Sequence, residues 1–169
     1  MCFARSQVSA INKVKSVISQ YCPKNHPASL PSSTLPKFLA WHFENKVSVD
    51  DTLCHQADFL AHQLCFPTES SASVKSLNFT PFVSDWHNSL KLGYDPKKEE
   101  YPQWLLSLIS DLGYKPLHLL PRVIQPGTEM GSMSDEIVSR YSFPRDCKVI
   151  AGIESYIHFI ESPSLKYVM

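Results

Sequence analysis

The chain has 169 residues, of which 43% are hydrophobic and 19% charged, as expected for one globular domain or a large part of one. Lys plus Arg and Asp plus Glu number 16 each, so the formal net charge is zero and no electrostatic attraction favours nucleic acid or an anionic membrane. The composition also excludes collagen-like, disordered and disulfide-scaffold proteins, and no apolar run approaches the roughly 20 residues that cross a bilayer.

The amino-terminal stretch is basic and rich in serine, and its first acidic residue is Glu44. This composition is typical either of an organelle transit peptide or of an ordinary surface that lacks acids. The cysteines lie far apart and form no C-x-x-C motif, so the sequence favours free thiols in a reducing compartment over disulfides. The five cysteines are Cys2, Cys22, Cys54, Cys65 and Cys147.

The first expected helix covers residues 34–43. Residues 1–33 show no sustained periodicity, and three prolines in their second half favour extended or turn backbone. Thr34 is placed to cap the helix, and Pro36 falls in its first turn, where a missing N–H costs little.

A second helix is expected to begin after Asp50 or Asp51, either of which can cap it, and to end by Pro67. Its apolar residues recur at helical spacing and predict one buried face, made of Leu53, Ala57, Leu60, Ala61 and Leu64. Residues 68–81 are Ser-rich and long for a connection inside a compact domain, which predicts an inserted loop.

The second half of the chain alternates helices with short strands. The expected elements are a helix over 101–112 that Gly113 ends, a β-like run over 119–124, a turn at Pro126 and Gly127, a helix from Ser134 to about Tyr141, a short buried strand over 148–152 and a helix over 153–160. This alternation predicts an α/β fold, rich in helix.

Most motifs that identify an enzyme are absent, including the phosphate-binding P-loop, G-x-G-x-x-G, G-x-S-x-G and H-E-x-x-H. His55 and His62 lie seven residues apart on one helix, about 10 Å along its axis, which is too far to bind one metal ion directly. We therefore predict surface or partly packed imidazoles. Asp85 and His87 would share a strand face and form an acid–base couple, although such pairs are common by chance. The tryptophans are expected in the core, because no basic stripe accompanies them.

Two strings in the second half are the most specific features of the sequence. Residues 84–95 read Ser-Asp-aromatic-x-Asn-x-Leu-Lys-x-Gly-Tyr-Asp, and residues 120–127 read Leu-Pro-x-Val-x-x-Pro-Gly. Together with residues 23–26, 32–35 and 55–60, in this order, they resemble the FGGY carbohydrate kinases. The sequence looks closest to the pentulose (ribulose or xylulose) kinase branch of cyanobacteria and plant plastids.

The resemblance runs from about Lys13 to Ser162 and implies a fold and a reaction. The fold would be part of the amino-terminal domain of a two-domain, actin-like (ribonuclease-H-like) sugar kinase. The reaction would be ATP-dependent phosphorylation of a sugar hydroxyl with Mg²⁺. On this basis residues 1–12 are unassigned, 13–162 belong to the partial kinase domain and 163–169 form a tail. The location would be the cytoplasm or a plastid, with no secretion signal, and few residues remain for a transit peptide.

The resemblance also assigns one catalytic candidate. The family's catalytic Asp lies after a strand, at a helix start, in a Gly-Thr-Thr-Asp-Ser type of motif. With one residue deleted after Gly152, Glu154 aligns with that Asp and Ser155 with the following Ser. A carboxylate there can accept a hydroxyl proton; alternatively, Glu154 is only a favourable acid in a first helical turn. Glu is one methylene longer than Asp, and a misplacement of about 1 Å can cost on the order of a hundredfold in rate.

The match implies that the family's first phosphate loop and its second domain lie outside this chain. The isolated chain is therefore expected to be inactive, and neither ATP nor Mg²⁺ is expected to bind it well. Uncovered sheet edges and helix faces would leave it marginally stable or in need of a partner. The alternatives are a non-catalytic module that pairs with a full-length kinase or a complementary half, and a degenerate remnant. Asp85, His87 and Asn88 are family-like, but no sugar contact is assigned to them.

Overall fold

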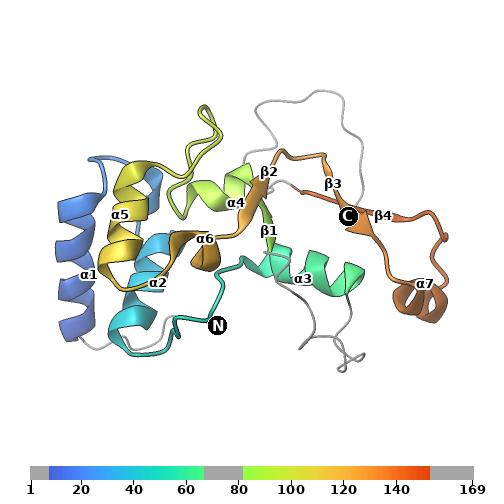
Figure 1. The fold of residues 1–169 in the computed structure, drawn as a ribbon, viewed down its shortest axis with the longest axis horizontal. Coiled ribbons are helices and arrows are strands. Elements are labelled where there is room, and N and C mark those ends of the chain that lie inside the picture. The colour runs from blue at the N-terminus through green and yellow to red at the C-terminus, as the bar shows by residue number, and fades with distance from the viewer. Residues whose placement is uncertain (1–7, 67–81, 153–169) are drawn as a thin grey trace.

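The computed structural model describes residues 8–66 and 82–152, and it is a mixed α/β fold rich in helix (Figure 1). Helices α1 (Val8–Tyr21), α2 (Thr34–Phe43), α5 (Gln103–Asp111) and α6 (Pro116–Leu119) gather at one end of the molecule. Two pairs of strands lie toward the other end, and α3 (Gln56–Cys65) starts below β1 and runs toward α7 (Asp135–Tyr141). The α/β class is therefore confirmed.

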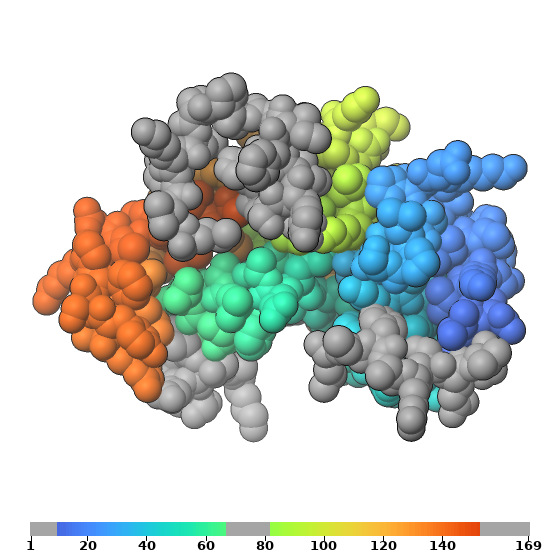
Figure 2. Space-filling view, turned by 180° about the vertical axis from the view of Figure 1, so that it is seen from behind, coloured from blue at the N-terminus to red at the C-terminus, as the bar shows by residue number. Residues whose placement is uncertain are grey.

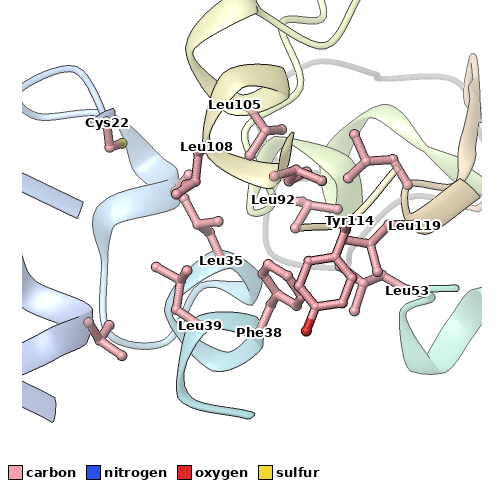
Figure 3. Close-up of a cluster of buried hydrophobic side chains, with 14 of the residues drawn as sticks. Cys22, Leu35, Phe38, Leu39, Leu53, Leu92, Leu105, Leu108, Tyr114 and Leu119 are labelled. Atoms are coloured by element: carbon pink, nitrogen blue, oxygen red, sulfur yellow. The ribbon is translucent and has the colours of Figure 1, made fainter. Parts of the chain in front are cut away.

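The main core lies between α2 and α5. Leu35, Phe38, Leu39, Leu105 and Leu108 are buried there, and the rings of Phe38 and Tyr114 meet edge to face (Figure 3). Full burial of one such side chain stabilises the fold by about 1.5–3 kcal/mol. The helices predicted over 34–43 and 101–112 are present, the second as Gln103–Asp111. Thr34 does not cap α2 as predicted: it is the first helical residue, and the cap is Ser33, whose side chain makes no capping hydrogen bond.

Helix α1 contradicts the expectation that residues 1–33 hold no regular element. Ala10 and Val14 are buried, and Val17, Ile18 and Tyr21 complete the face that packs on α2 and α5. Their three- and four-residue spacing was a usable signal. The polar residues between these apolar positions obscured the helical periodicity. The short 3₁₀ helix η1 (Pro27–Ser29) follows.

A short parallel pair of strands connects the helical end to the rest of the chain. Strand β1 (Val83–Asp85) pairs with β2 (Arg122–Ile124), with Ser84 opposite Val123. Helix α4 (Trp86–Leu90), α5 and α6 lie between them in sequence, as a parallel pair requires a long crossover. The β-like run predicted over 119–124 is thus a strand only from residue 122.

A second, antiparallel pair joins β3 (Glu129–Ser132) to β4 (Lys148–Ile150), with α7 between them in sequence. The hydroxyl of Ser134 accepts from the Ile137 N–H at 3.3 Å, so the predicted helix and its cap are confirmed. The strand predicted over 148–152 is also present. It is not wholly buried, because only its Val149 turns inward while Lys148 and Ile150 are exposed.

Helix α3 differs most from its prediction. It begins at Gln56, several residues after Asp51, and its cap is His55. Leu53 is buried ahead of the helix, whereas Leu60, expected on the buried face, is 57% exposed. The physical reason is that Asp58, not the apolar stripe, turns inward, where its carboxylate accepts a hydrogen bond from the His55 backbone N–H and lies 2.9 Å from His55 Nδ1.

Several predictions fall outside the described residues: the inserted loop at 68–81, the helix over 153–160 and the catalytic candidate Glu154. The four described cysteines are free thiols. Trp104 packs against the core, whereas Trp41 is 38% exposed, contrary to expectation. Across 8–66 and 82–152, no helix is both long and apolar enough to span a membrane.

Candidate functional site

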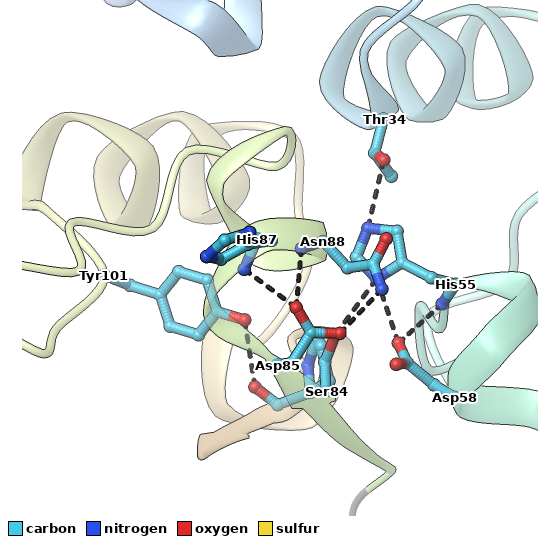
Figure 4. A network of polar contacts seen from close by, with 9 residues as sticks. Thr34, His55, Asp58, Ser84, Asp85, His87, Asn88 and Tyr101 are labelled. Carbon is cyan, nitrogen blue, oxygen red and sulfur yellow. Dashed lines mark hydrogen bonds and ion pairs between the residues drawn. The ribbon is translucent and has the colours of Figure 1, made fainter. Parts of the chain in front are cut away.

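The main polar cluster of the described chain centres on His55, whose side chain is 11% exposed (Figure 4). Its Nε2 lies 3.0 Å from the Thr34 hydroxyl at the start of α2. Its Nδ1 lies 2.9 Å from a carboxylate oxygen of Asp58 in α3 and 3.2 Å from the hydroxyl of Ser84 in β1. One imidazole therefore connects two helices and a strand.

Local geometry holds His55 in place. Its backbone N–H donates to Asp58 at 2.8 Å, and its side chain accepts from the third residue of α3, so the two residues form a reciprocal capping box. Asp58 is only 3% exposed, and its carboxylate also stands next to Nδ1. Burial of this carboxylate is offset in part by the hydrogen bond that it accepts from the His55 backbone N–H.

Thr34, His55 and Asp58 present a hydroxyl, an imidazole and a carboxylate in the order found in hydrolase triads. Such a triad also needs N–H donors free to stabilise an oxyanion. The N–H groups of Thr34 and Leu35 both donate to the carbonyl of Lys91, at 3.1 and 3.2 Å. These two N–H groups are therefore used within the fold, and they are not free to stabilise an oxyanion.

Asp85 does not form the acid–base couple considered from sequence. Its Oδ1 accepts from the backbone N–H groups of His87 and Asn88, at 2.8 and 3.0 Å, and its Oδ2 accepts from the Asn88 amide at 2.7 Å. The residues that follow Asp85 form a helix and not a strand, so the carboxylate caps α4 and does not reach the His87 ring. The family-like Asp85, His87 and Asn88 are thereby brought together as a helix start.

Tyr101 adds a further connection beside this helix start. Its hydroxyl donates to the carbonyl of Pro121 at 2.9 Å, just before β2, and burial raises its pKa (Figure 4). The phenol therefore stays protonated at neutral pH and fixes the approach to β2.

His62 lies apart from His55 and packs between two rings, with centroids 5.1 Å from Phe66 and 4.7 Å from Phe82. Burial lowers the pKa of His62. The expectation of partly packed imidazoles is confirmed, and no group of three His, Cys, Asp or Glu side chains within the described ranges is placed to hold a metal ion.

Four of the described glycines are constrained by the fold itself. A side chain at Gly93 would start 2.9 Å from Cη2 of Trp104, and one at Gly131 would start 3.1 Å from Sγ of Cys65. Gly113 and Gly127 have positive φ and form turns. Each of these four positions therefore has a structural reason to be glycine.

Sequence reasoning singled out His55 and Asp85 but missed the connections they make. The His55–Asp58 spacing was a readable capping signal. The contacts with Thr34 and Ser84 join residues 21 and 29 positions away, which no local pattern reveals. No protein-family model matches this amino-acid sequence.

Proposed function

We propose that this chain derives from an FGGY-type carbohydrate kinase and forms part of the family's amino-terminal, actin-like domain. The family reaction is transfer of a phosphoryl group from ATP to a sugar hydroxyl, with a pentulose as the sugar. Glu154 is the proposed catalytic base, on its alignment with the family's Asp. The chain alone is proposed to be inactive.

The supporting observation is that segments of the resemblance, distant in sequence, contact one another. Residues 32–35 meet residues 84–95 through the N–H groups of Thr34 and Leu35 and the Lys91 carbonyl. Residues 55–60 meet both segments through His55. Residues 120–128 supply β2, which pairs with β1. The signature strings thus build one unit, which is what a shared ancestral fold predicts.

In this proposal the described residues are a scaffold and not reactants. Asp85 and His55 have their hydrogen-bonding groups directed at backbone and neighbouring side chains. A kinase relies mostly on positioning and on electrostatic stabilisation of phosphate charge. No step of the reaction is assigned to the described residues.

A non-catalytic module that binds a full-length kinase is the second candidate. It is favoured by the outward face of α3, where Phe59 and Leu60 are exposed, while the one charged residue of this helix, Asp58, is buried. Interface centres are poor in charge and rich in aromatic residues.

The test measures ADP formation by the pure full chain with Mg-ATP and D-ribulose or D-xylulose, and its binding to a pentulose kinase of the cyanobacterial type. We expect no ADP above a sugar-free blank and measurable binding to the kinase. Sugar-dependent ADP formation that Glu154→Gln abolishes would instead make the chain a kinase in its own right. Glu136→Gln, on α7, is the matched control. Absence of binding to the kinase would overturn the second candidate, and sugar-dependent turnover would overturn the proposal that the chain alone is inactive.

A further inference from the structure

The β3–β4 pair has an outward and an inward face, and its hydrogen bonds identify them. Ser132 lies opposite Lys148, both residues are exposed, and the Lys148 ammonium donates to the Ser132 hydroxyl at 2.9 Å. The neighbouring pair, Gly131 opposite Val149, therefore faces the other way, because successive residues of a strand point to opposite faces. Val149 is 7% exposed, so this second face is the inward one.

Cys147 lies on this inward face. The N–H of Met133 donates to the Cys147 carbonyl at 3.1 Å, so these two residues are opposite each other and continue the alignment of the strand pair. Cys147 comes two residues before Val149, and a spacing of two returns a side chain to the same face of a strand. The partly buried thiol of Cys147 is therefore on the same side of the strand pair as Val149.

Cys65, the last residue of α3, lies over the same face. Its Sγ is 3.1 Å from the position that a Cβ on Gly131 would occupy, so the glycine leaves the room that the sulfur fills. The carbonyl of the preceding residue, Leu64, accepts from the Ser134 N–H at 3.0 Å, which fixes the end of α3 beside the end of β3. In the view from behind, the green end of α3 meets the orange region that contains α7 (Figure 2).

We propose that Cys65 and Cys147 are a redox-sensitive pair that forms a reversible disulfide between α3 and the β3–β4 pair. Gly131 and Cys147 are diagonal neighbours on the inward face, a separation of about 7–8 Å, and the Cys65 sulfur already lies over Gly131. A disulfide needs Cβ atoms about 3.5–4.5 Å apart. Cys65 ends α3 and Cys147 precedes β4, and a shift at the end of an element breaks few backbone hydrogen bonds.

Glutathione disulfide is the oxidant for this exchange. The Cys147 thiolate attacks one of its sulfurs, the S–S bond breaks, and one glutathione thiolate leaves. The Cys65 thiolate then attacks the Cys147 sulfur and displaces the second glutathione. Two protein thiols are oxidised, one disulfide is reduced, and the two protons end on the two glutathione thiols. Burial raises the pKa of the Cys65 thiol, which places Cys65 second in this order.

Mass spectrometry of the full chain tests the pair. The dilute chain is incubated with glutathione disulfide at mildly alkaline pH, alkylated, and digested with trypsin and chymotrypsin without reduction, because cleavage after Phe59 separates Cys54 from Cys65. We expect one intramolecular link, between Cys65 and Cys147, that dithiothreitol removes. Cys65→Ser and Cys147→Ser should each abolish the link, whereas the matched control Cys54→Ser should retain it.

Three results would overturn the proposal. One is glutathione attached to both cysteines as separate mixed disulfides with no link between them, because the two thiols would then be too far apart. Another is a link from either cysteine to Cys22 or Cys54 that is as frequent as the expected one. The third is a wild-type chain in which both thiols stay reduced.

Far-ultraviolet circular dichroism checks that each variant keeps its helices. If a serine variant fails to fold, the linked peptides of the wild type and of Cys54→Ser decide the question by themselves. The disulfide proposal does not depend on the kinase proposal, because neither ATP nor a sugar enters its test.

Discussion

The Nε2 atom of His55 lies 3.0 Å from the hydroxyl oxygen of Thr34, and this contact joins the beginning of α3 to the beginning of α2. Nδ1 of the same ring is engaged by Asp58 and Ser84, so the imidazole has partners on both sides. A buried group of this kind contributes mainly through the penalty that follows when one partner is lost.

Replacing the Thr34 hydroxyl is expected to destabilise the fold. Thr34→Val keeps the side-chain shape but leaves His55 Nε2 without its partner, which should lower the free energy of unfolding by about 1–3 kcal/mol. Urea denaturation followed by tryptophan fluorescence measures the loss. Thr34→Ser keeps the hydroxyl and should recover most of it. A Thr34→Val variant as stable as the wild type would mean that the hydrogen bond with His55 contributes nothing.

Asp85 is predicted to stabilise the fold by capping the start of α4. Asp85→Ala removes the acceptor of two backbone N–H groups and should cost about 0.5–2 kcal/mol, the usual range for a lost cap. Asp85→Asn retains an acceptor oxygen and should cost less. The comparison is made by thermal unfolding at pH 7. If the alanine variant melts with the wild type, the cap contributes nothing.

Gly93 is expected to be the least replaceable glycine of the described part. Its φ is +119°, and an added Cβ would lie 2.9 Å from the Trp104 ring. Gly93→Ala therefore combines backbone strain with overpacking, and the overpacking alone costs about 1–3 kcal/mol. Gly113→Ala is the control, because φ there is +89° but no atom lies within 4 Å of the added carbon. Equal melting temperatures for the two variants would contradict the steric part of this explanation.

Stability should fall in mild acid. Burial lowers the pKa of His42 from its ordinary value of 6.5, and its Nδ1 lies 2.8 Å from the Tyr114 hydroxyl. The unfolded chain then binds a proton more readily than the folded one, so the free energy of unfolding decreases as the pH drops below about 6.5. It levels off once the pH is below the lowered pKa of the folded state.

Urea denaturation at a series of pH values between 7.5 and 5 measures the slope of the free energy of unfolding against pH. His42→Gln removes one contributing group and should flatten the slope, while His26 and His62, whose pKa values burial also lowers, still contribute. A slope unchanged in His42→Gln would remove that residue from the explanation.

Much of the secondary structure was predictable, because caps and periodicity are local signals. Ser134, Gly113 and the apolar positions of α5 marked their elements correctly. Helix α3 was predictable in existence but not in orientation. Its apolar stripe pointed to one face, and the hydrogen bonds of Asp58 with His55 selected another. A polar contact that crosses elements outweighed local hydrophobicity, and single-sequence patterns do not record it.

The candidate site was less predictable than the fold. Asp85 and His87 were considered together because of their spacing, but a carboxylate two residues before an imidazole is equally suited to cap a helix. The deciding fact was that a helix begins at Trp86. The position where a helix begins therefore determines whether the carboxylate of such a pair faces the imidazole or caps the helix.

The pairing of β1 with β2 has a consequence for the order of folding. The two strands run parallel and lie 39 residues apart in register, Val83 opposite Arg122, with three helices between them. Each strand is three residues long, so few backbone hydrogen bonds offset the entropy of closing that loop. The helices can form from neighbouring residues, whereas the strand pair must wait until α5 and α6 have packed. We therefore expect amide protons of β1 to gain protection late in a refolding experiment, after those of α5.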